Sequence, residues 1–319
     1  LDGAGNMAVA GYSIIDGRSW VFSVWRLDAQ GNMLPGWPRY VASGHAYGTG
    51  VVIDADGDIV ACGSSGPTGR DQILLAKYRP DGSAAEGWPR ALQPVAGQGA
   101  FSYDVIRDAD GNLVVAGYAG SAAGGRDAVL YKLDAAGNVL PGWPKIWDSG
   151  PGTYDEYFAL SQDAGGDYCV VGTAQGTNED GGRLLVTRYG ADGEQRPGWP
   201  WIYGHDGVRN YSPPDAWRGS ADGAGGIAAA FIAAAAAPQV LTLRYRPDGS
   251  LAGGFPKTAA RDGYLVGTRS CVVDVEGDIY TLGFSHPVGN EDADHTTFVA
   301  KYPPGAYSTA RPSLVTAEG

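Results

Sequence analysis

The stretch Asp108–Gly117 reads DADGNLVVAG and joins a turn sequence to a short apolar strand. Its first half favours a tight turn, because Gly accepts positive φ and an Asp side chain hydrogen bonds to the backbone just after it. Its second half is rich in β-branched residues, which are enriched in strands. The stretch therefore predicts a turn that leads into a strand, and its recurrence decides the fold.

Copies of this pattern occur along the whole chain. They begin at Asp2, Asp54, Asp108, Asp163, Asp222 and Asp274, and the copy at Asp222 is degenerate. Five copies continue into a further strand and a Gly-aromatic-Pro motif, whose aromatic residues are Trp37, Trp88, Trp143, Trp199 and Phe255. The copies start 52 to 59 residues apart, which is typical of a four-stranded β-propeller blade. We expect the recurring rings to fill the contacts between blades.

The composition supports short strands. The 319 residues include 51 Gly and 20 Pro, with 44% hydrophobic and 18% charged residues. Frequent Gly and Pro exclude a helical bundle, and the hydrophobic fraction excludes intrinsic disorder.

The copy number predicts an all-β, six-bladed propeller of four-stranded antiparallel blades that forms one domain, residues 1–319. The expected blades are 1–43 with 313–319, 44–97, 98–152, 153–206, 207–260 and 261–312. The first copy lacks the strand that precedes the Asp-Gly turn elsewhere. We expect the C-terminal segment Ser313–Gly319 to pair with the first blade and close the ring, which removes open edges.

Several copies resemble a known repeat family. Leu74–Ser83 (LLAKYRPDGS), Leu241–Ser250 (LTLRYRPDGS) and Asp110–Tyr118 (DGNLVVAGY) are similar to the bacterial delta-sixty type and related propeller repeats. The Gly-Trp-Pro ending departs from that type. The resemblance implies a bacterial protein at an extracellular, cell-surface or periplasmic location, and it transfers no catalytic residue.

Charge and hydropathy exclude two classes of partner. The net charge of −12 would repel nucleic acid. The longest apolar stretch, Ile227–Pro238, is mostly Ala and too short to span a membrane. Cys62, Cys169 and Cys271 are widely spaced, so we expect neither a disulfide framework nor a zinc site.

The loops that join blades differ in every copy, whereas the other turns repeat almost verbatim. Function tends to sit in variable loops on a rigid frame. These loops hold aromatic and polar residues around His45 and Tyr47, Phe101 and Tyr103, Tyr154–Tyr157, His205–Trp217 and Asp262–Arg269. The predicted ligand-binding residues are Tyr157, Arg209, Tyr211, Asp215, Trp217, His45 and His205, and the alternative interpretation is that the rings pack between blades.

Metal binding and catalysis are alternatives for the same residues. DADGD resembles a fragment of a calcium loop, but a hairpin turn accounts for it, so we expect no cofactor. Asp292 and Asp294 are the candidate ligands of an alternative calcium site. His45 and His205 occupy comparable loops, and with Asp155, Glu156 or Asp215 they would suit a metal or acid–base pair.

The sequence favours a non-catalytic module that binds a protein or glycan through its variable loops, with no assigned catalytic residue. The first alternative is a structural subunit of a cell-surface assembly. The second is a propeller hydrolase or lyase.

Overall fold

A computed structural model of the chain describes residues 1–15, 19–43, 45–66, 71–92, 98–176, 182–203, 218–221, 225–233, 239–259, 263–287, 296–303 and 314–317. In these ranges all regular elements are strands, which confirms the all-β prediction. None of them contains a helix long and apolar enough to cross a membrane. The chain divides into two compact units, unit 1 (Leu1–Gly152) and unit 2 (Thr153–Gly319).

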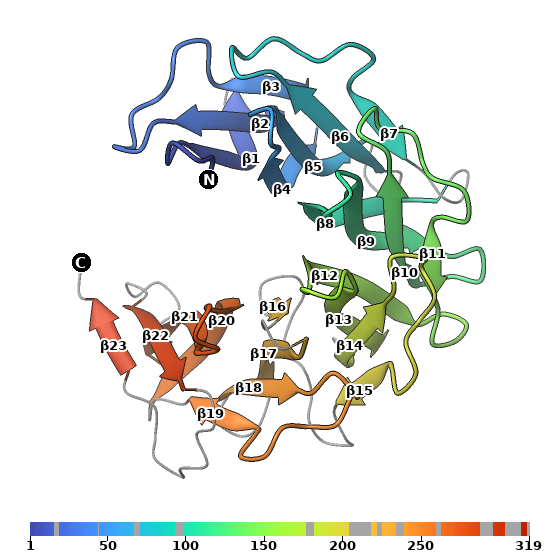
Figure 1. The fold of residues 1–319 in the computed structure, drawn as a ribbon, viewed down its shortest axis with the longest axis vertical. Helices are drawn as coiled ribbons and strands as arrows, with labels where there is room; N and C mark the ends of the chain where they lie inside the picture. Colours follow the sequence, from blue (N-terminus) through green and yellow to red (C-terminus); the bar gives the residue numbers. More distant parts are fainter. Residues whose placement is uncertain are drawn as a thin grey trace. The chain divides into compact units, whose positions relative to one another are not determined.

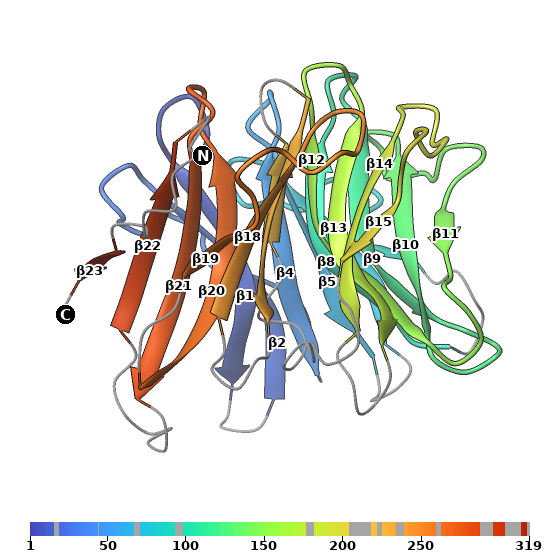
Figure 2. The same cartoon turned by 90° about the horizontal axis from the view of Figure 1, so that it is seen from below.

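Unit 1 contains three groups of antiparallel strands, which follow one another from blue to green in Figure 1. The first group is β1 (Met7–Ile15), β2 (Ser19–Leu27) and β3 (Arg39–Ser43); the second is β4 (Ala46–Ile53), β5 (Ile59–Ser65), β6 (Gln72–Tyr78) and β7 (Arg90–Leu92); the third is β8 (Ala100–Arg107), β9 (Leu113–Gly120), β10 (Arg126–Leu133) and β11 (Lys145–Trp147). Within each group, each strand pairs with its neighbour in sequence. The connections lie at the two ends of the strands (Figure 2).

Unit 2 repeats this arrangement. The fourth group is β12 (Tyr154–Gln162), β13 (Tyr168–Gly176), β14 (Arg183–Tyr189) and β15 (Trp201–Tyr203); the fifth is β16 (Arg218–Ala221), β17 (Ile227–Ala233), β18 (Gln239–Tyr245) and β19 (Lys257–Ala259); the sixth is β20 (Tyr264–Val273), β21 (Ile279–Pro287), β22 (Thr296–Tyr302) and β23 (Leu314–Ala317). All pairings inside these groups are antiparallel.

The ends of the chain correct one prediction. β23 pairs with β22, with Leu314 opposite Ala300 and Ala317 opposite Thr297, so the tail does not close a ring by pairing with the first group. The sixth repeat lacks the Gly-aromatic-Pro motif, and the tail satisfies the backbone groups at the open edge of β22 instead. Among the described residues the first group has three strands, because no strand precedes its Asp-Gly turn.

The Asp-Gly turn follows the first strand of a group and is held by its leading aspartate. Asp54 Oδ1 accepts the backbone N–H groups of Asp56 and Asp58 at 3.0 and 2.9 Å, while Gly57 adopts a φ of 80°. Asp54 Oδ2 accepts a hydrogen bond from Lys77 Nζ at 3.1 Å. Equivalent pairs join Asp2 to Arg26, Asp108 to Lys132 and Asp163 to Arg188. These carboxylates therefore serve the turn and a cation of the third strand.

A bulge near the start of the first strand explains the glycine within the second strand of the second and third groups. A methyl group at Gly63 would overlap the Tyr47 carbonyl oxygen, and one at Gly117 would overlap that of Phe101. The pairing register shifts at these points, between Gly48 and Gly50 and between Ser102 and Asp104. Because a bulge re-aims neighbouring side chains, this repeated feature positions the residues at the strand ends, where the candidate site lies.

The core of each unit lies between adjacent strand groups. Trp37 belongs to a cluster that joins the first and second groups, and its ring meets Tyr78 edge-on at 5.8 Å. Trp199 meets Tyr245 in the same way at 6.0 Å between the fourth and fifth groups. Trp88 and Phe255 pack against further clusters of this kind, and Trp143 is half-buried. One large ring per repeat thus fills an intergroup contact.

Candidate functional site

Most of the predicted ligand-binding residues lie outside the described part of the chain. His205, Arg209, Tyr211, Asp215 and Trp217 fall in 204–217, and the candidate calcium ligands Asp292 and Asp294 fall in 288–295. Within the described ranges, no group of three or more His, Cys, Asp or Glu side chains is arranged to hold a metal ion. Two predicted site residues, Tyr157 and His45, lie within the described ranges.

Tyr157 is not a loop residue. It lies in β12 with a fully buried side chain, and its hydroxyl shares a 2.8 Å hydrogen bond with the hydroxyl of Tyr189. Burial raises the pKa of the Tyr157 hydroxyl well above its usual value. The strand begins at Tyr154, and its residues 155–160 are all buried. Tyr157 therefore has no accessible surface with which to contact a ligand.

His45 occupies the predicted kind of position. It lies between β3 and β4 with an exposed side chain and a φ of 57°, in the left-handed region that residues other than Gly rarely adopt. Such backbone strain clusters at functional sites. Its ring lies 6.4 Å from the ring of Trp20.

Three exposed or half-buried rings contact one another beside this histidine. Tyr12 of β1 stacks on Trp20 of β2 with centroids 5.0 Å apart and ring planes 12° apart. Tyr47 of β4 meets the Trp20 ring edge-on at 4.9 Å. Tyr12 is 49% exposed and Trp20 36% exposed. We call Tyr12, Trp20, His45 and Tyr47 the rim cluster; exposed rings with polar tips suit sugar binding.

A carboxyl group belongs to the same site. Asp71 directly precedes β6 and is half-buried. Loss of hydration raises the pKa of the Asp71 carboxyl, and the nearby charge of His45 opposes that rise. Burial also raises the pKa of Tyr47, and the charge of Asp71 adds to it. An imidazole, a phenol and a carboxyl group close to one another are suited to proton transfer.

The sequence pointed to His45 and Tyr47 but missed the other members of this site. Tyr12 and Trp20 lie inside strands whose alternating pattern looks structural. A usable signal is the residue after the repeat's glycine, which is aromatic in the first (Tyr12), third (Tyr118) and sixth (Phe284) copies. Asp71 carries no such repeat signal.

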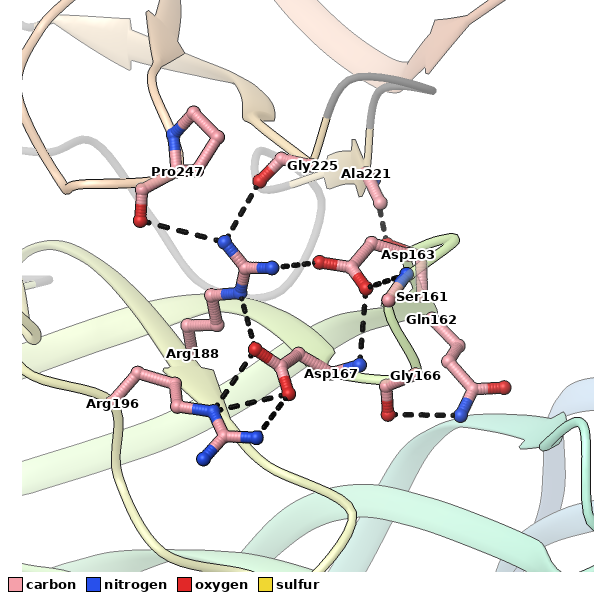
Figure 3. Close-up of polar contacts among 11 residues, drawn as sticks. Ser161, Gln162, Asp163, Gly166, Asp167, Arg188, Arg196, Ala221, Gly225 and Pro247 are labelled. Atoms are coloured by element: carbon pink, nitrogen blue, oxygen red, sulfur yellow. Dashed lines mark hydrogen bonds and ion pairs between the residues drawn. The ribbon is translucent and has the colours of Figure 1, made fainter.

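A separate concentration of charge lies in unit 2 (Figure 3). Arg188 of β14 pairs with Asp163 and, through Nε at 2.9 Å, with Asp167. Its Nη1 donates to the carbonyl oxygens of Gly225 at 3.0 Å and Pro247 at 3.4 Å. One guanidinium therefore ties the turn of the fourth group to two turns of the fifth.

Arg196 completes this network. Its Nε and Nη2 donate to both oxygens of Asp167 at 2.6 to 3.1 Å. These hydrogen bonds hold the pKa of the Asp167 carboxyl below its usual value. The carboxylates are neutralised by guanidinium groups, so the network serves as a structural link between strand groups and not as an acid–base site.

Comparisons with known proteins agree on the fold. A family model described as a domain of unknown function (DUF5122) beta-propeller matches residues 109–139. A polysaccharide lyase, an ulvan lyase, is similar in structure when free (TM-score 0.61) and bound to -[GlcA(1-4)Rha3S]- (TM-score 0.60). In both, 13% of residues are identical, and the match covers 100% of this chain and 81% of the lyase chain.

A protein of unknown function from Dyadobacter fermentans is also similar, with a TM-score of 0.55 and 11% identity over 90% of this chain and 89% of that one. No curated protein matches the sequence. At such low identity the structural likeness concerns the fold. Together with the family match, it supports a propeller repeat protein with an all-β, propeller-like fold; the delta-sixty type is not distinguished.

These neighbours correct the functional prediction. A non-catalytic recognition module is contradicted, because two of the three similar structures named are of a polysaccharide lyase. The alternative of a propeller hydrolase or lyase agrees better with them.

Proposed function

We propose that the chain is a propeller enzyme that degrades polysaccharide, with its acid–base groups on the rim of unit 1. The observation that carries this proposal is the rim cluster, in which the stacked, exposed rings of Tyr12 and Trp20 contact Tyr47 and the Trp20 ring lies near His45. The charge of Asp71 acts on both titratable members of the cluster. The rings offer stacking faces to sugar, and the three titratable groups supply and accept protons. The likeness to a lyase solved with a bound saccharide supports the same class of substrate.

The residues favour elimination over hydrolysis. Glycoside hydrolysis usually employs two carboxyl groups that flank the bond, and in the described rim Asp71 is the carboxyl group coupled to His45 and Tyr47. In elimination from a uronic acid residue, His45 removes the C5 proton and the C4–O bond breaks. A C4=C5 double bond forms, and the leaving oxygen takes a proton from Asp71.

The raised pKa values fit these roles. Asp71 remains protonated to a higher pH than an ordinary aspartate, which suits the role of proton donor. Tyr47 keeps its hydroxyl proton and donates a hydrogen bond to the sugar.

The number of blades, their limits and the location of the protein are part of the same proposal. Six blades within one domain, with the blade limits predicted from the repeats, would give a rigid frame that presents the rim. An extracellular, surface or periplasmic location fits an enzyme whose polymeric substrate cannot enter a cell.

The test is an assay against ulvan, alginate, pectate and a neutral xylan. Elimination produces new reducing ends together with the ultraviolet absorbance of a conjugated double bond, whereas hydrolysis produces reducing ends alone. We expect His45→Asn and Asp71→Asn each to lower kcat about 100-fold or more. Asn tolerates the backbone conformation of His45, so folding is preserved.

Tyr40→Ala is the matched control, because Tyr40 is a 54% exposed ring on β3, away from the rim cluster. It should leave the rate unchanged. Cleavage of none of the polymers, or wild-type rates in both rim variants, would overturn the proposal.

A further inference from the structure

A second set of rings lies at the ends of the strands of the third group. Phe101 and Tyr103 of β8 are 5.0 Å apart, and Phe101 stacks against Tyr118 of β9 at 6.0 Å with ring planes 9° apart. The guanidinium carbon of Arg126, at the start of β10, lies 4.3 Å from the centre of the Tyr118 ring. All four side chains are half-buried, so part of each faces solvent. We call them the second ring group.

The backbone connects this group to the proposed acid. The N–H of Ala100, the residue before Phe101, donates to the carbonyl oxygen of Asp71 at 2.7 Å. Two further hydrogen bonds fasten β8 to the second strand group, from Thr49 Oγ1 to the Ser102 carbonyl and from Ser102 Oγ to the Gly63 carbonyl, both at 2.9 Å. The second ring group is therefore held at a fixed position next to the Asp71 segment.

We infer that the second ring group is a further sugar-binding subsite, so that the substrate is a chain that contacts the rim cluster and the second ring group together. This inference rests on the proposed function and narrows its substrate to a polymer. A single sugar residue fills one set of rings. A chain that passes Asp71 uses both, with a sugar face on the rings of Phe101 and Tyr118 and hydroxyl or carboxylate oxygens on the donors of Arg126.

Arg126 gives the subsite a preference among polymers. Its guanidinium carries a fixed charge and a planar set of donors that match a carboxylate. Because the guanidinium is already aligned over the Tyr118 ring, less conformational freedom is lost when it binds. The subsite should hold a uronic acid residue more tightly than a neutral sugar.

The experiment is affinity electrophoresis in native gels cast with ulvan, alginate, pectate or neutral xylan, which measures binding without turnover. The gel that retards the wild type most is used to compare the variants. In that gel, Phe101→Ala and Tyr118→Ala should each weaken binding by about threefold to tenfold. Tyr118→Leu keeps apolar volume and removes the ring, so it guards against a loss caused by misfolding and should weaken binding similarly. Arg126→Gln should weaken binding to alginate or pectate more than to xylan.

A second readout separates this inference from the proposed function. On the polymer that the wild type cleaves, Tyr118→Leu should raise KM for the polymer severalfold and leave the rate on its shortest cleaved fragments unchanged, with Tyr40→Ala as control. Cleavage that depends on His45 while the ring variants keep wild-type KM and retardation would overturn the subsite alone. A wild type that neither binds nor cleaves any polymer would overturn both.

Discussion

At the scale of single residues, the leading aspartate of each repeat combines two tasks. Asp108 Oδ1 accepts the N–H of Asn112 at 2.7 Å within the turn, and Oδ2 pairs with Lys132 at 3.1 Å. Both side chains of this ion pair are buried. A buried ion pair adds little compared with apolar packing, but the loss of one partner leaves an uncompensated charge.

We therefore predict that Asp108→Asn lowers the free energy of unfolding by about 3 kcal/mol, as measured by urea denaturation. Asp134→Asn is the control, because Asp134 holds an equivalent but exposed turn through the N–H of Asn138 at 2.8 Å. Asp134→Asn should lower the free energy of unfolding by a clearly smaller amount. Equal losses in the two variants would mean that the turn hydrogen bonds matter and the buried charge does not.

A second residue-scale prediction concerns the coupling of Asp71 to His45. The charge of His45 lowers the pKa of Asp71, which burial raises. In His45→Asn that charge is gone, so the pKa of Asp71 should rise further, as followed by NMR titration of its carboxyl carbon. Activity that needs protonated Asp71 should correspondingly fall as pH rises through this pKa. An unchanged or lowered pKa of Asp71 in the variant would show that the charge of His45 does not act on Asp71.

At the scale of elements, arginine in the third strand links neighbouring strand groups. Arg188 reaches the carbonyl oxygens of Gly225 and Pro247, and Arg26 reaches that of Pro80 at 3.0 Å. The guanidinium makes this possible because its separate nitrogens donate in different directions. An ammonium is a single donor centre, and at the equivalent position Lys77 Nζ pairs with Asp54 and Asp58 of its own strand group.

Arg188→Lys should therefore keep the charge but lower the free energy of unfolding by about 2 kcal/mol, since the carbonyl groups of Gly225 and Pro247 lose their charged donor. The reverse change at the equivalent position, Lys77→Arg, is the matched control and should not destabilise the protein. Thermal unfolding of both variants measures the difference. A wild-type midpoint for Arg188→Lys would assign the stability to charge alone.

The same network predicts an acid-sensitive element. Hydrogen bonds from Arg196 lower the pKa of Asp167 below its usual 3.8. A carboxyl group with a lowered folded-state pKa stabilises the fold above its unfolded pKa, and this contribution is lost as the pH falls through the folded value. Unfolding experiments below pH 3.8 should show this loss in the wild type and a reduced pH dependence in Asp167→Asn. If the stability of the wild type and of Asp167→Asn fell in parallel with pH, Asp167 would not be the acid-sensitive group.

At the scale of the whole molecule, local patterns predicted the strand groups but not the ends of the chain. Each repeat carries its own turn, strand and glycine, so its hairpins follow from neighbouring residues. The tail Ser313–Gly319 faced two open edges with similar backbone groups. Its sequence gives no local reason to choose β22 over β1, and the structure pairs its described part, Leu314–Ala317, with β22.

The candidate site was predictable in part for the same reason. His45 and Tyr47 stood out because their loop differs between copies. The prediction that Tyr157 is a loop residue was wrong, because β12 already begins at Tyr154. Tyr12 and Trp20 meet on the paired strands β1 and β2. Tyr47 and Asp71 belong to the second group, and they join these rings only through contacts between strand groups, which no spacing within one repeat encodes.

Net charge gives the last prediction. The chain carries −12 at pH 7, so an anionic polysaccharide is repelled at long range, while a neutral one is not. Salt shortens the reach of this repulsion, from about 30 Å at 0.01 M to about 10 Å at 0.1 M. The value of kcat/KM on alginate or pectate should therefore rise with salt over this range, and that on xylan should stay constant. If the rate on the anionic polymers falls instead, local attraction by cations such as Arg126 outweighs the overall charge.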